Sequence, residues 1–308
     1  MSRITAMLSI FLLLPTAAPI FAQPPPATPA SSDAKADPLL GKAVMPIAGA
    51  RLRRLEKETS LRDVPAPFIV RKIDGNWLWV GRAWIKRSDV IPIEKAIEYY
   101  TAIIEKQPSE AWAYDFRGAV YHEIGDLEKA LEDHTRAIEL SPKDPTYLNN
   151  RGLVLLELGR PEEALADFES ALKLDPKFAM AYCNRGALRI GTGDHQGALA
   201  DYSAALKNDS DCAEAYNGLA WIQATSNDAQ FRDGRKAVDN ATKAARLTGY
   251  GDLAILDTLA AAHAEAGEWE EAIKQQKRAI ELAGGNAEYV REAEQRLKLY
   301  QEKKPYRE

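Results

Sequence analysis

A repeat with a period of about 34 residues runs through the sequence from Pro92 onward and constrains its fold more than any other feature. When the sequence is laid on itself at this offset, small, aromatic and turn-forming residues align in six columns. The columns are Ala96, Ala130, Ala164 and Ala198; Tyr100, His134, Phe168 and Tyr202; Ile103, Ala137, Ala171 and Ala205; Pro108, Pro142 and Pro176; Gly118, Gly152 and Gly186; and Gly125, Gly159 and Gly193. A fixed period of this length indicates a chain built from one short structural unit that stacks on copies of itself.

The spacing within each unit predicts a pair of helices. Intervals of four and three residues place Ala130, His134 and Ala137 on one helical face, where small side chains let a second helix approach closely. Gly125 followed by Asp126 ends one helix and begins the next, and Pro142 ends the second helix. Each unit is therefore a helical hairpin that buries its apolar face only by stacking on its neighbours.

This pattern resembles the tetratricopeptide repeat. We place a half unit at 92–110, full units at 111–144, 145–178, 179–212, 213–250 and 253–285, and a terminal helix at 286–303. The fourth unit has five extra residues in the turn at 226–234. The resemblance implies a mainly α fold, a tetratricopeptide helical-hairpin solenoid preceded by a small antiparallel β-barrel.

Residues 40–91 have the two-residue period of β-strands. Residues 68–73 form a β-rich run, Asp74-Gly75 is a hairpin turn signal, and residues 77–80 resume as a strand. Residues 74–90 resemble the bacterial Src-homology-3-like barrel, although Ala83-Trp84 stands where that family usually has Gly-Trp. We expect this barrel to replace the missing first helix of the half unit and to cap the helical stack.

Residues 1–22 resemble a cleaved secretory signal peptide. Arg3 precedes an apolar stretch at 4–14 that is too short to cross a bilayer, and Ala22 offers a small residue for cleavage. An uncleaved anchor is the alternative, which Pro15 and Pro19 disfavour. Residues 23–39 form a proline-rich linker that we expect to be disordered. The chain is expected to be exported, to the periplasm or the extracellular space, with no stable membrane span after cleavage.

Composition and motifs argue against catalysis and against nucleic-acid binding. The net charge is -5, whereas nucleic-acid binding needs a cationic surface. The chain contains no G-x-S-x-G and no phosphate-binding loop motif, so we expect no enzyme activity, no cofactor and no metal. Structural roles are expected for His122, His134, His195 and His263. Cys183 and Cys212 are expected to be free thiols beyond disulfide reach.

The resemblance implies that the first helices of the hairpins line a concave, ligand-binding surface. Aromatic rings and amides there suit an extended peptide, since amides pair with backbone groups and rings supply apolar contact. The candidate residues are Trp112, Phe116, Asn149, Asn150, Met180, Asn184, Asn217 and Trp221, with Asp115 and Cys183 beside them. A clamp for a terminal carboxylate is disfavoured, because the cationic positions of such a clamp hold Thr146, Met180, Glu214 and Gly218.

The tryptophans of the barrel form a second candidate site. Trp77, Trp79 and Trp84 alternate along strands, so we expect one ring in the core and another exposed, with Trp79 and Trp84 as ligand-binding candidates. Residues 40–91 carry a net charge of +6 and residues 92–308 a net charge of -11, so the barrel either binds a ligand or only docks on the stack.

The predicted function is a non-catalytic, exported scaffold or adaptor that binds a peptide segment of a protein partner. The alternative is a subunit that targets an envelope enzyme complex to peptidoglycan through the barrel. The sequence leaves open the identity of the partner and the oligomeric state.

Overall fold

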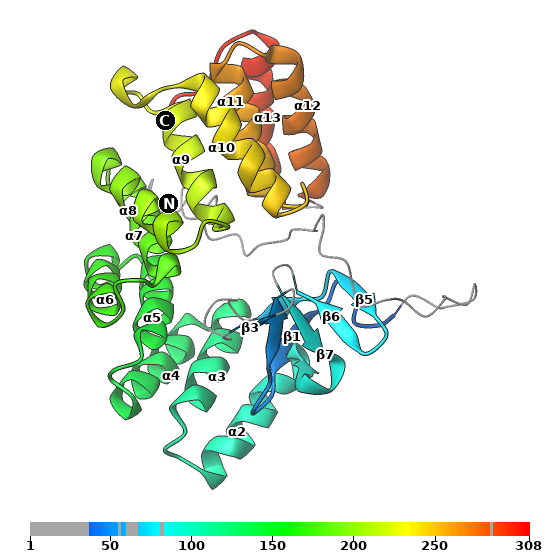
Figure 1. Ribbon diagram of the computed structural model, residues 1–308, viewed down its shortest axis with the longest axis vertical. Helices are drawn as coiled ribbons and strands as arrows, with labels where there is room; N and C mark the ends of the chain where they lie inside the picture. Colours follow the sequence, from blue (N-terminus) through cyan, green and yellow to red (C-terminus); the bar gives the residue numbers. More distant parts are fainter. Residues whose placement is uncertain (1–36, 55–56, 60–66, 81–82, 284–285) are drawn as a thin grey trace. The chain divides into compact units, whose positions relative to one another are not determined.

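The computed structural model describes residues 37–54, 57–59, 67–80, 83–283 and 286–308. The described chain divides into two compact parts, a first part at residues 37–176 and a second part at residues 177–308 (Figure 1). The predicted signal peptide and nearly all of the predicted linker lie outside the described residues.

Short antiparallel strands begin the first part. One sheet has the order β4-β1-β8 and the other has the order β3-β2-β7-β6-β5. The strands are β1 (Ala43–Pro46), β2 (Leu52–Arg54), β3 (Lys57–Thr59), β4 (Phe68–Ile69), β5 (Lys72–Asp74), β6 (Trp77–Trp79), β7 (Trp84–Lys86) and β8 (Val90–Pro92). The predicted turn at Asp74-Gly75 joins β5 to β6, with Gly75 at a φ of 55°.

The run at 68–73 is two strands rather than the single strand that its composition suggests. The chain changes sheets at its middle, because Val70 exchanges backbone hydrogen bonds with Gly41 and Lys42 beside β1, at 2.8 and 3.0 Å. The next residue, Arg71, donates its N–H to the carbonyl of Trp79 in the other sheet, at 2.8 Å. Composition alone does not reveal this crossing, because β-propensity is the same on both sides of it.

The strands pack directly on the first helix. Residues Ile93–Lys95 form a 3₁₀ turn, η3, that leads into α2 (Ala96–Lys106). Met45 of β1 is fully buried in one apolar cluster with Tyr100 of α2, and the Tyr100 hydroxyl donates to the carbonyl of Pro46. The backbone N–H of Ala48 donates to the Tyr99 hydroxyl at 3.2 Å. Within the first part, the end of β1 and the residues just after it thus pack on α2.

Helical hairpins make up the rest of both parts. The first part has α3 (Ala111–Glu123), α4 (Leu127–Leu140), α5 (Pro145–Glu157) and α6 (Pro161–Leu174). The second part has α7 (Ala179–Gly191), α8 (His195–Asn208), α9 (Ala213–Thr225), η4 (Ala229–Phe231), α10 (Gly234–Leu247), α11 (Leu253–Glu265), α12 (Trp269–Leu282) and α13 (Ala287–Gln301). The predicted fold class, a helical-hairpin solenoid after small antiparallel strands, is confirmed. The five extra residues of the fourth unit accommodate η4.

The repeated alanines and glycines serve close helix packing. Ala130, Ala164 and Ala198 are fully buried. Gly118, Gly152 and Gly186 of the first helices each face the ring of the second helix in the same hairpin: a Cβ on Gly152 would lie 2.6 Å from Cε1 of Phe168. The turns follow the expected chemistry, since Gly193 has a φ of 83° and the Asp194 side chain accepts from the N–H of Gly197 at 2.9 Å.

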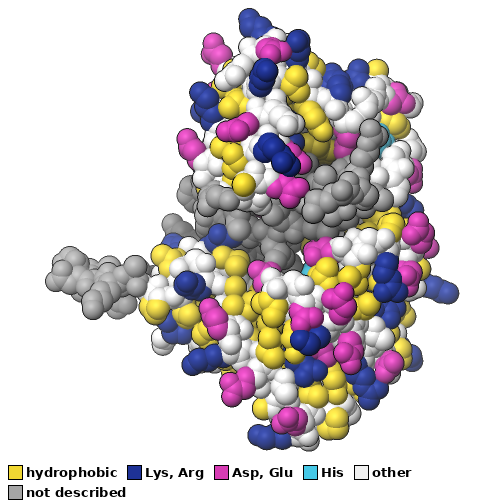
Figure 2. Space-filling view, turned by 180° about the vertical axis from the view of Figure 1, so that it is seen from behind, with side chains coloured by type: hydrophobic (Ala, Val, Ile, Leu, Met, Phe, Trp, Pro, Cys, Tyr) yellow, Lys and Arg dark blue, Asp and Glu magenta, His cyan; other side chains and the backbone are white. Residues whose placement is uncertain are grey.

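The surface is charged and mixed. On the face shown in Figure 2, Lys and Arg side chains are interspersed with Asp and Glu side chains over each part. Across the described residues, no helix has the length and apolar character needed to cross a membrane.

Candidate interaction surfaces

The first helices of successive hairpins lie side by side. α3 contacts α5 in the first part, and α9 contacts both α7 and α11 in the second part. We call the surface that these helices share the first-helix surface of each part. The predicted binding residues of the helical region all lie on these first helices, four in the first part and four in the second.

Two half-buried aromatic rings stand at one end of the α3–α5 surface. The ring centroids of Trp112 and Phe116 lie 6.2 Å apart at an interplanar angle of 68°. The buried ring of Tyr100 lies behind both, 6.3 Å from Trp112 and 5.8 Å from Phe116. The indole Nε1 of Trp112 donates to the carboxylate of Glu110 at 2.6 Å. The two rings are therefore fixed in orientation while part of each stays accessible.

An amide and carboxylate network follows the rings along this surface. The Asn150 amide Nδ2 donates to both carboxylate oxygens of Asp115, at 3.1 and 3.2 Å, and its Oδ1 accepts from Asn149 at 3.3 Å. The Asp115 carboxylate also lies 2.8 Å from Nδ1 of His134 in α4. Asp115, His134 and Asn149 are buried, whereas Asn150 is half-buried. The network orients the Asn150 side chain, the predicted amide that remains partly accessible here.

A histidine and glutamate pair that the sequence did not single out as a site lies across the same two helices. Nε2 of His122 on α3 is 2.9 Å from the Glu157 carboxylate on α5. Their side chains are 22% and 37% exposed. The two residues are 35 positions apart, so the period of the repeat itself was the signal that could have paired them.

The first-helix surface of the second part is covered over α9. Met180 and Asn184 on α7 are half-buried, whereas Asn217 and Trp221 on α9 are buried. Trp221 is 1% exposed, and its indole Nε1 donates to the Glu308 carboxylate at 2.9 Å. The segment that ends the sequence thus lies on a predicted binding residue, an arrangement that the sequence did not predict.

The two cysteines are closer than the sequence prediction stated. Cys183 and Cys212 are both free and buried, as 4% and 0% of their surfaces are exposed. Their sulfur atoms, however, lie 3.1 Å apart. The prediction that they lie beyond disulfide reach was wrong, because it compared helix axes. Cys212 is the N-cap of α9, where its side chain can point back to α7.

The tryptophans of β6 and β7 differ from the predicted arrangement. Trp79 and Trp84 are 9% and 7% exposed, and their rings pack on each other with centroids 5.3 Å apart. The two residues are partners in the β6–β7 register. The expectation that Trp79 and Trp84 present a ring to a ligand is therefore corrected. Trp77 is the half-buried ring, and Nζ of Lys86 lies 5.7 Å from its centroid.

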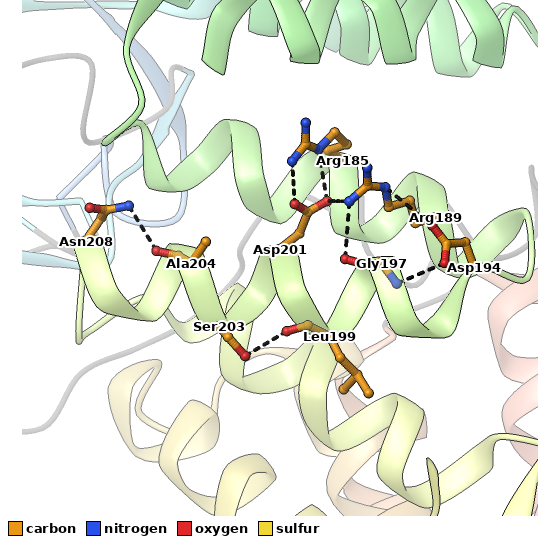
Figure 3. Close-up of polar contacts among 9 residues, drawn as sticks. All are labelled: Arg185, Arg189, Asp194, Gly197, Leu199, Asp201, Ser203, Ala204 and Asn208. Atoms are coloured by element: carbon orange, nitrogen blue, oxygen red, sulfur yellow. Dashed lines mark hydrogen bonds and ion pairs between the residues drawn. The ribbon is translucent and has the colours of Figure 1, made fainter. Parts of the chain in front are cut away.

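A ladder of arginine and aspartate pairs links the two helices of three hairpins, and sequence reasoning missed it. Each arginine lies on a first helix and pairs with an aspartate sixteen residues later on the second helix. The pairs are Arg117–Asp133 at 2.7 Å, Arg151–Asp167 at 2.8 Å and Arg185–Asp201 at 2.6 Å. Figure 3 shows the third pair, in which Arg189 also reaches Asp201, at 2.7 Å.

These pairs are structural rather than ligand-binding. Each aspartate is buried and accepts two hydrogen bonds from its arginine, a geometry typical of strong bidentate pairs. The hydrogen bonds to the carboxylates raise the pKa of Arg117 and of Arg151 above the usual range. Arg117 also donates to the hydroxyl of Thr101 on α2 at 3.0 Å, so the ladder ties neighbouring hairpins together.

The remaining histidines have local partners. Nδ1 of His195 lies 3.0 Å from the Ser226 hydroxyl, and Nδ1 of His263 lies 2.6 Å from the Glu268 carboxylate. Burial lowers the pKa of His195. Within the part of the chain that the structure describes, no group of three or more His, Cys, Asp or Glu side chains could hold a metal ion.

Helical hairpins of this length, with the small residues of one helix against the rings of the next, define a class of stacked-repeat interaction proteins. Family models described as tetratricopeptide repeat match residues 118–182, 183–230 and 253–283. The chain therefore carries tetratricopeptide repeats over these residues. No match was found among curated proteins.

Solved structures show the same fold. The chain is similar to a structure of the APC/C hetero-tetramer Cut9–Hcn1, with a TM-score of 0.60 and 14% identity over 68% of this chain and 40% of that chain. It is also similar to PilW, a type IV pilus biogenesis factor, with a TM-score of 0.53 and 20% identity over 66% of this chain and 90% of that one. The chain is similar as well to TTC0263, a thermophilic TPR protein of Thermus thermophilus. The TM-score is 0.51, and the identity is 19% over 62% of this chain and 98% of that chain. This chain spans less than half of the matched chain in the Cut9–Hcn1 structure. Tetratricopeptide repeats are in general protein interaction modules, and these likenesses establish the fold.

Proposed function

We propose that this protein is a non-catalytic interaction scaffold whose α3–α5 surface binds an extended segment of a protein partner. The observation that carries the proposal is the pair of rings of Trp112 and Phe116, held in place yet half-exposed beside an oriented amide. Rigid aromatic rings give large apolar contact at little cost in conformational entropy. The Asn150 amide next to them offers hydrogen bonds of the kind that a peptide backbone requires.

The His122–Glu157 pair favours a segment that carries polar residues beyond its apolar anchor. His122 and Glu157 each stand about two turns of helix beyond the amide network, on the same first helices. An extended segment that lays an apolar side chain on the rings would meet this pair further along, since extended chains advance about 3.3 Å per residue. The chemistry expected of the partner is an apolar or aromatic anchor followed by polar residues.

Replacing Phe116 with asparagine tests the proposal, because Asn150 and Asn184 occupy the same column in the next two repeats. The substitution removes one of the two rings, and we expect peptides selected for binding to the full chain to lose about tenfold in affinity. Fluorescence anisotropy with the selected peptides measures the loss. The matched control is Tyr114→Ala, a half-buried aromatic of the same helix whose ring lies 5.7 Å from the Arg117 guanidinium.

Equal affinity of the parent chain and the Phe116→Asn variant for every selected peptide would refute the proposal. A loss that Tyr114→Ala reproduces would also refute it, since the effect would then follow from weakened helix packing. Far-ultraviolet circular dichroism verifies that both variants keep their helices.

We also propose that the protein is exported, with residues 1–22 as a cleaved signal, and that the strands of residues 43–92 form a Src-homology-3-like barrel. The sequence supports the export proposal. The two small antiparallel sheets and their packing on α2 support a capping role for the barrel. Mass spectrometry of the mature protein tests the cleavage: a chain that begins at Met1 in the cell envelope would contradict it. Burial of Trp79 and Trp84 disfavours peptidoglycan binding through those rings.

A further inference from the structure

The final residues of the sequence return to the first-helix surface of the second part. α13 ends at Gln301, and the chain then runs back to the end of α9. The backbone N–H of Glu308 donates to the carbonyl of Thr225, the last residue of α9, at 3.0 Å. Residues 306–308 thus lie on helices that stand well before them in the sequence.

Three consecutive side chains of this segment make specific contacts. The Tyr306 ring packs on the Trp221 ring with centroids 6.0 Å apart, and the Arg296 guanidinium lies 5.7 Å from the Tyr306 ring centroid. The Arg307 guanidinium donates to the carbonyl of Ala224 at 3.2 Å and pairs with the Glu265 carboxylate. The Glu308 carboxylate accepts from the Trp221 indole at 2.9 Å. Trp221 therefore contacts both the ring and the carboxyl group of the segment, and the end of α9 together with Glu265 of α11 binds its cation.

The cation is matched to the end of the helix. The last carbonyls of a helix have no partner within it and form the negative end of its dipole. At the end of α9, Arg307 and the backbone N–H of Glu308 satisfy the carbonyls of Ala224 and Thr225. An arginine side chain suits this position because it can bond a carbonyl and a carboxylate at the same time.

The covered ring is also unusual within its column. Ala119, Leu153 and Ala187 stand at the equivalent position of the three earlier repeats and are all half-buried. Trp221 is the large aromatic member of the column, and it is 1% exposed. The protein's own segment therefore lies against the one large ring in this column.

We propose that residues 306–308 are an internal ligand of the α9–α11 surface, and that a partner segment with the same order of aromatic, cationic and carboxylic side chains binds there by displacing them. The inference rests on the proposed function only in assigning extended segments to first-helix surfaces. It concerns a different part of the chain from the α3–α5 surface. A segment tethered in cis has an effective concentration in the millimolar range, so a free segment of equal strength binds weakly until the tethered one is removed.

A labelled peptide with the sequence of residues 301–308, QEKKPYRE, tests the proposal. We expect fluorescence anisotropy to give a dissociation constant at least about tenfold lower for a variant that ends at Lys304 than for the full chain. The same peptide with alanine in place of Arg307 should bind the shortened variant about tenfold more weakly. Equal affinity for the two chains, or no binding to the shortened variant, would overturn the proposal.

A point variant of the full chain tests the same proposal if the shortened chain does not fold. Arg307→Ala in the full chain removes the contacts to Ala224 and Glu265 without exposing a new chain end, and should also raise peptide affinity. The matched control is Lys304→Ala, an exposed side chain that pairs with Glu302 of the same segment, and it should leave the affinity unchanged. A control that raises affinity as much as Arg307→Ala would argue against the proposal.

The result of this peptide experiment can be distinguished from the result of the Phe116→Asn test of the proposed function. Phe116→Asn should leave binding of this peptide to the shortened variant unchanged, since Phe116 lies in the first part. If no partner segment responds to Phe116→Asn, the α3–α5 proposal fails while the internal ligand of α9–α11 stands on its own measurement.

Binding of the segment should also depend on pH. Burial raises the pKa of Glu308 to about 7, although hydrogen bonds from Trp221 and Thr225 oppose that rise. The groups that interact with it are Trp221 and Thr225 of α9, Tyr202 of α8, and Tyr306 of the same segment. Because the bound carboxyl holds its proton more tightly than the free one, binding is strongest below a pH of about 4.5 and weakens as pH rises toward about 7.

With these two pKa values, we expect the QEKKPYRE peptide to bind the shortened variant about 70-fold more tightly at pH 5 than at pH 8. A peptide with Glu308→Gln carries no titrating side chain at this position and should bind with similar affinity at both pH values. Anisotropy titrations in two buffers of equal ionic strength measure both. Tighter binding of the parent peptide at pH 8 would contradict the assignment of a half-buried carboxyl group with a raised pKa.

Discussion

Replacement of Arg296 by alanine is expected to lower the free energy of unfolding of residues 177–308 by about 3–5 kcal/mol. Arg296 on α13 and Asp257 on α11 form an ion pair at 3.0 Å, and their side chains are 5% and 0% exposed. The Gln276 amide of α12 donates to the same Asp257 oxygen at 2.6 Å. One buried carboxylate thus joins three helices, and the substitution leaves it with a single neutral donor.

The size of this effect depends mainly on the Asp257 carboxylate, which stays buried without its partner, and less on the lost bond itself. Burial disfavours the charged form of Arg296, yet the carboxylate of Asp257 raises the pKa of Arg296 above its usual value. Removing one member of a buried pair leaves an uncompensated charge in a medium of low dielectric constant. Removing both members of the pair leaves no uncompensated charge. Asp257→Leu combined with Arg296→Leu should therefore be less destabilising than Arg296→Ala alone.

Urea denaturation followed by circular dichroism measures these changes. The matched control is Arg291→Ala, an exposed arginine of the same helix, for which we expect a change within about 0.5 kcal/mol. A loss below about 1 kcal/mol for Arg296→Ala, or a double variant less stable than the single one, would show that the buried pair does not hold α13 in place.

The helical part of the fold was predictable from the sequence because each column has a local physical cause. A positive φ at Gly125, the N-cap at Asp194 and buried alanines such as Ala164 are decided by residues within one hairpin or its neighbour. Interactions over such short sequence separations leave a period that can be read directly. The strand order was not readable in this way, because the crossing at Val70 depends on partners far earlier in the sequence, at Gly41 and Lys42.

The sequence predicted on which helices the candidate binding residues lie, but it did not predict which of their side chains are exposed. The repeat placed Trp221 and Phe116 on first helices, yet Trp221 is covered by a segment 87 residues later and Phe116 is not. Contacts of this kind obey no period. The buried ring of Trp79 shows the same limit: alternation along a strand predicts one buried face, whereas β6 buries both Trp79 and its neighbour Leu78, which point to opposite faces.

The arginine and aspartate ladder was missed although its period was visible. Arg117, Arg151 and Arg185 recur with the period of the repeat, each followed sixteen residues later by an aspartate. Charged residues on helices usually face water, and this assumption hid a column that pairs inward. A charged column that repeats with opposite sign at a fixed offset indicates a structural pair rather than a solvated face.

Gly218→Ala is expected to destabilise residues 177–308 by about 2–3 kcal/mol, even though alanine favours a helix over glycine by about 1 kcal/mol. A Cβ at this position would lie 2.1 Å from Cζ of Tyr202 and 2.4 Å from its Cε2. Tyr202 is 1% exposed, so its ring cannot swing into solvent. The glycine therefore stands in a column that holds Phe116, Asn150 and Asn184 in earlier repeats, because only a hydrogen fits beside this ring.

A second glycine next to the Tyr202 ring allows the cost of an added Cβ to be compared at two distances. A Cβ on Gly186, on the opposite helix α7, would lie 3.0 Å from the same Cζ atom, so Gly186→Ala needs a shift of only a few tenths of an ångström. We expect it to cost less than about 1 kcal/mol, since the gain in helix propensity offsets the contact. Tyr202→Leu, which removes the Cζ atom, should recover part of the loss when it is combined with Gly218→Ala. Urea denaturation measures the stability of both variants. Equal stability of Gly218→Ala and Gly186→Ala would mean that α9 moves away from the Tyr202 ring. Close packing of α8 between α7 and α9 would then not require glycine.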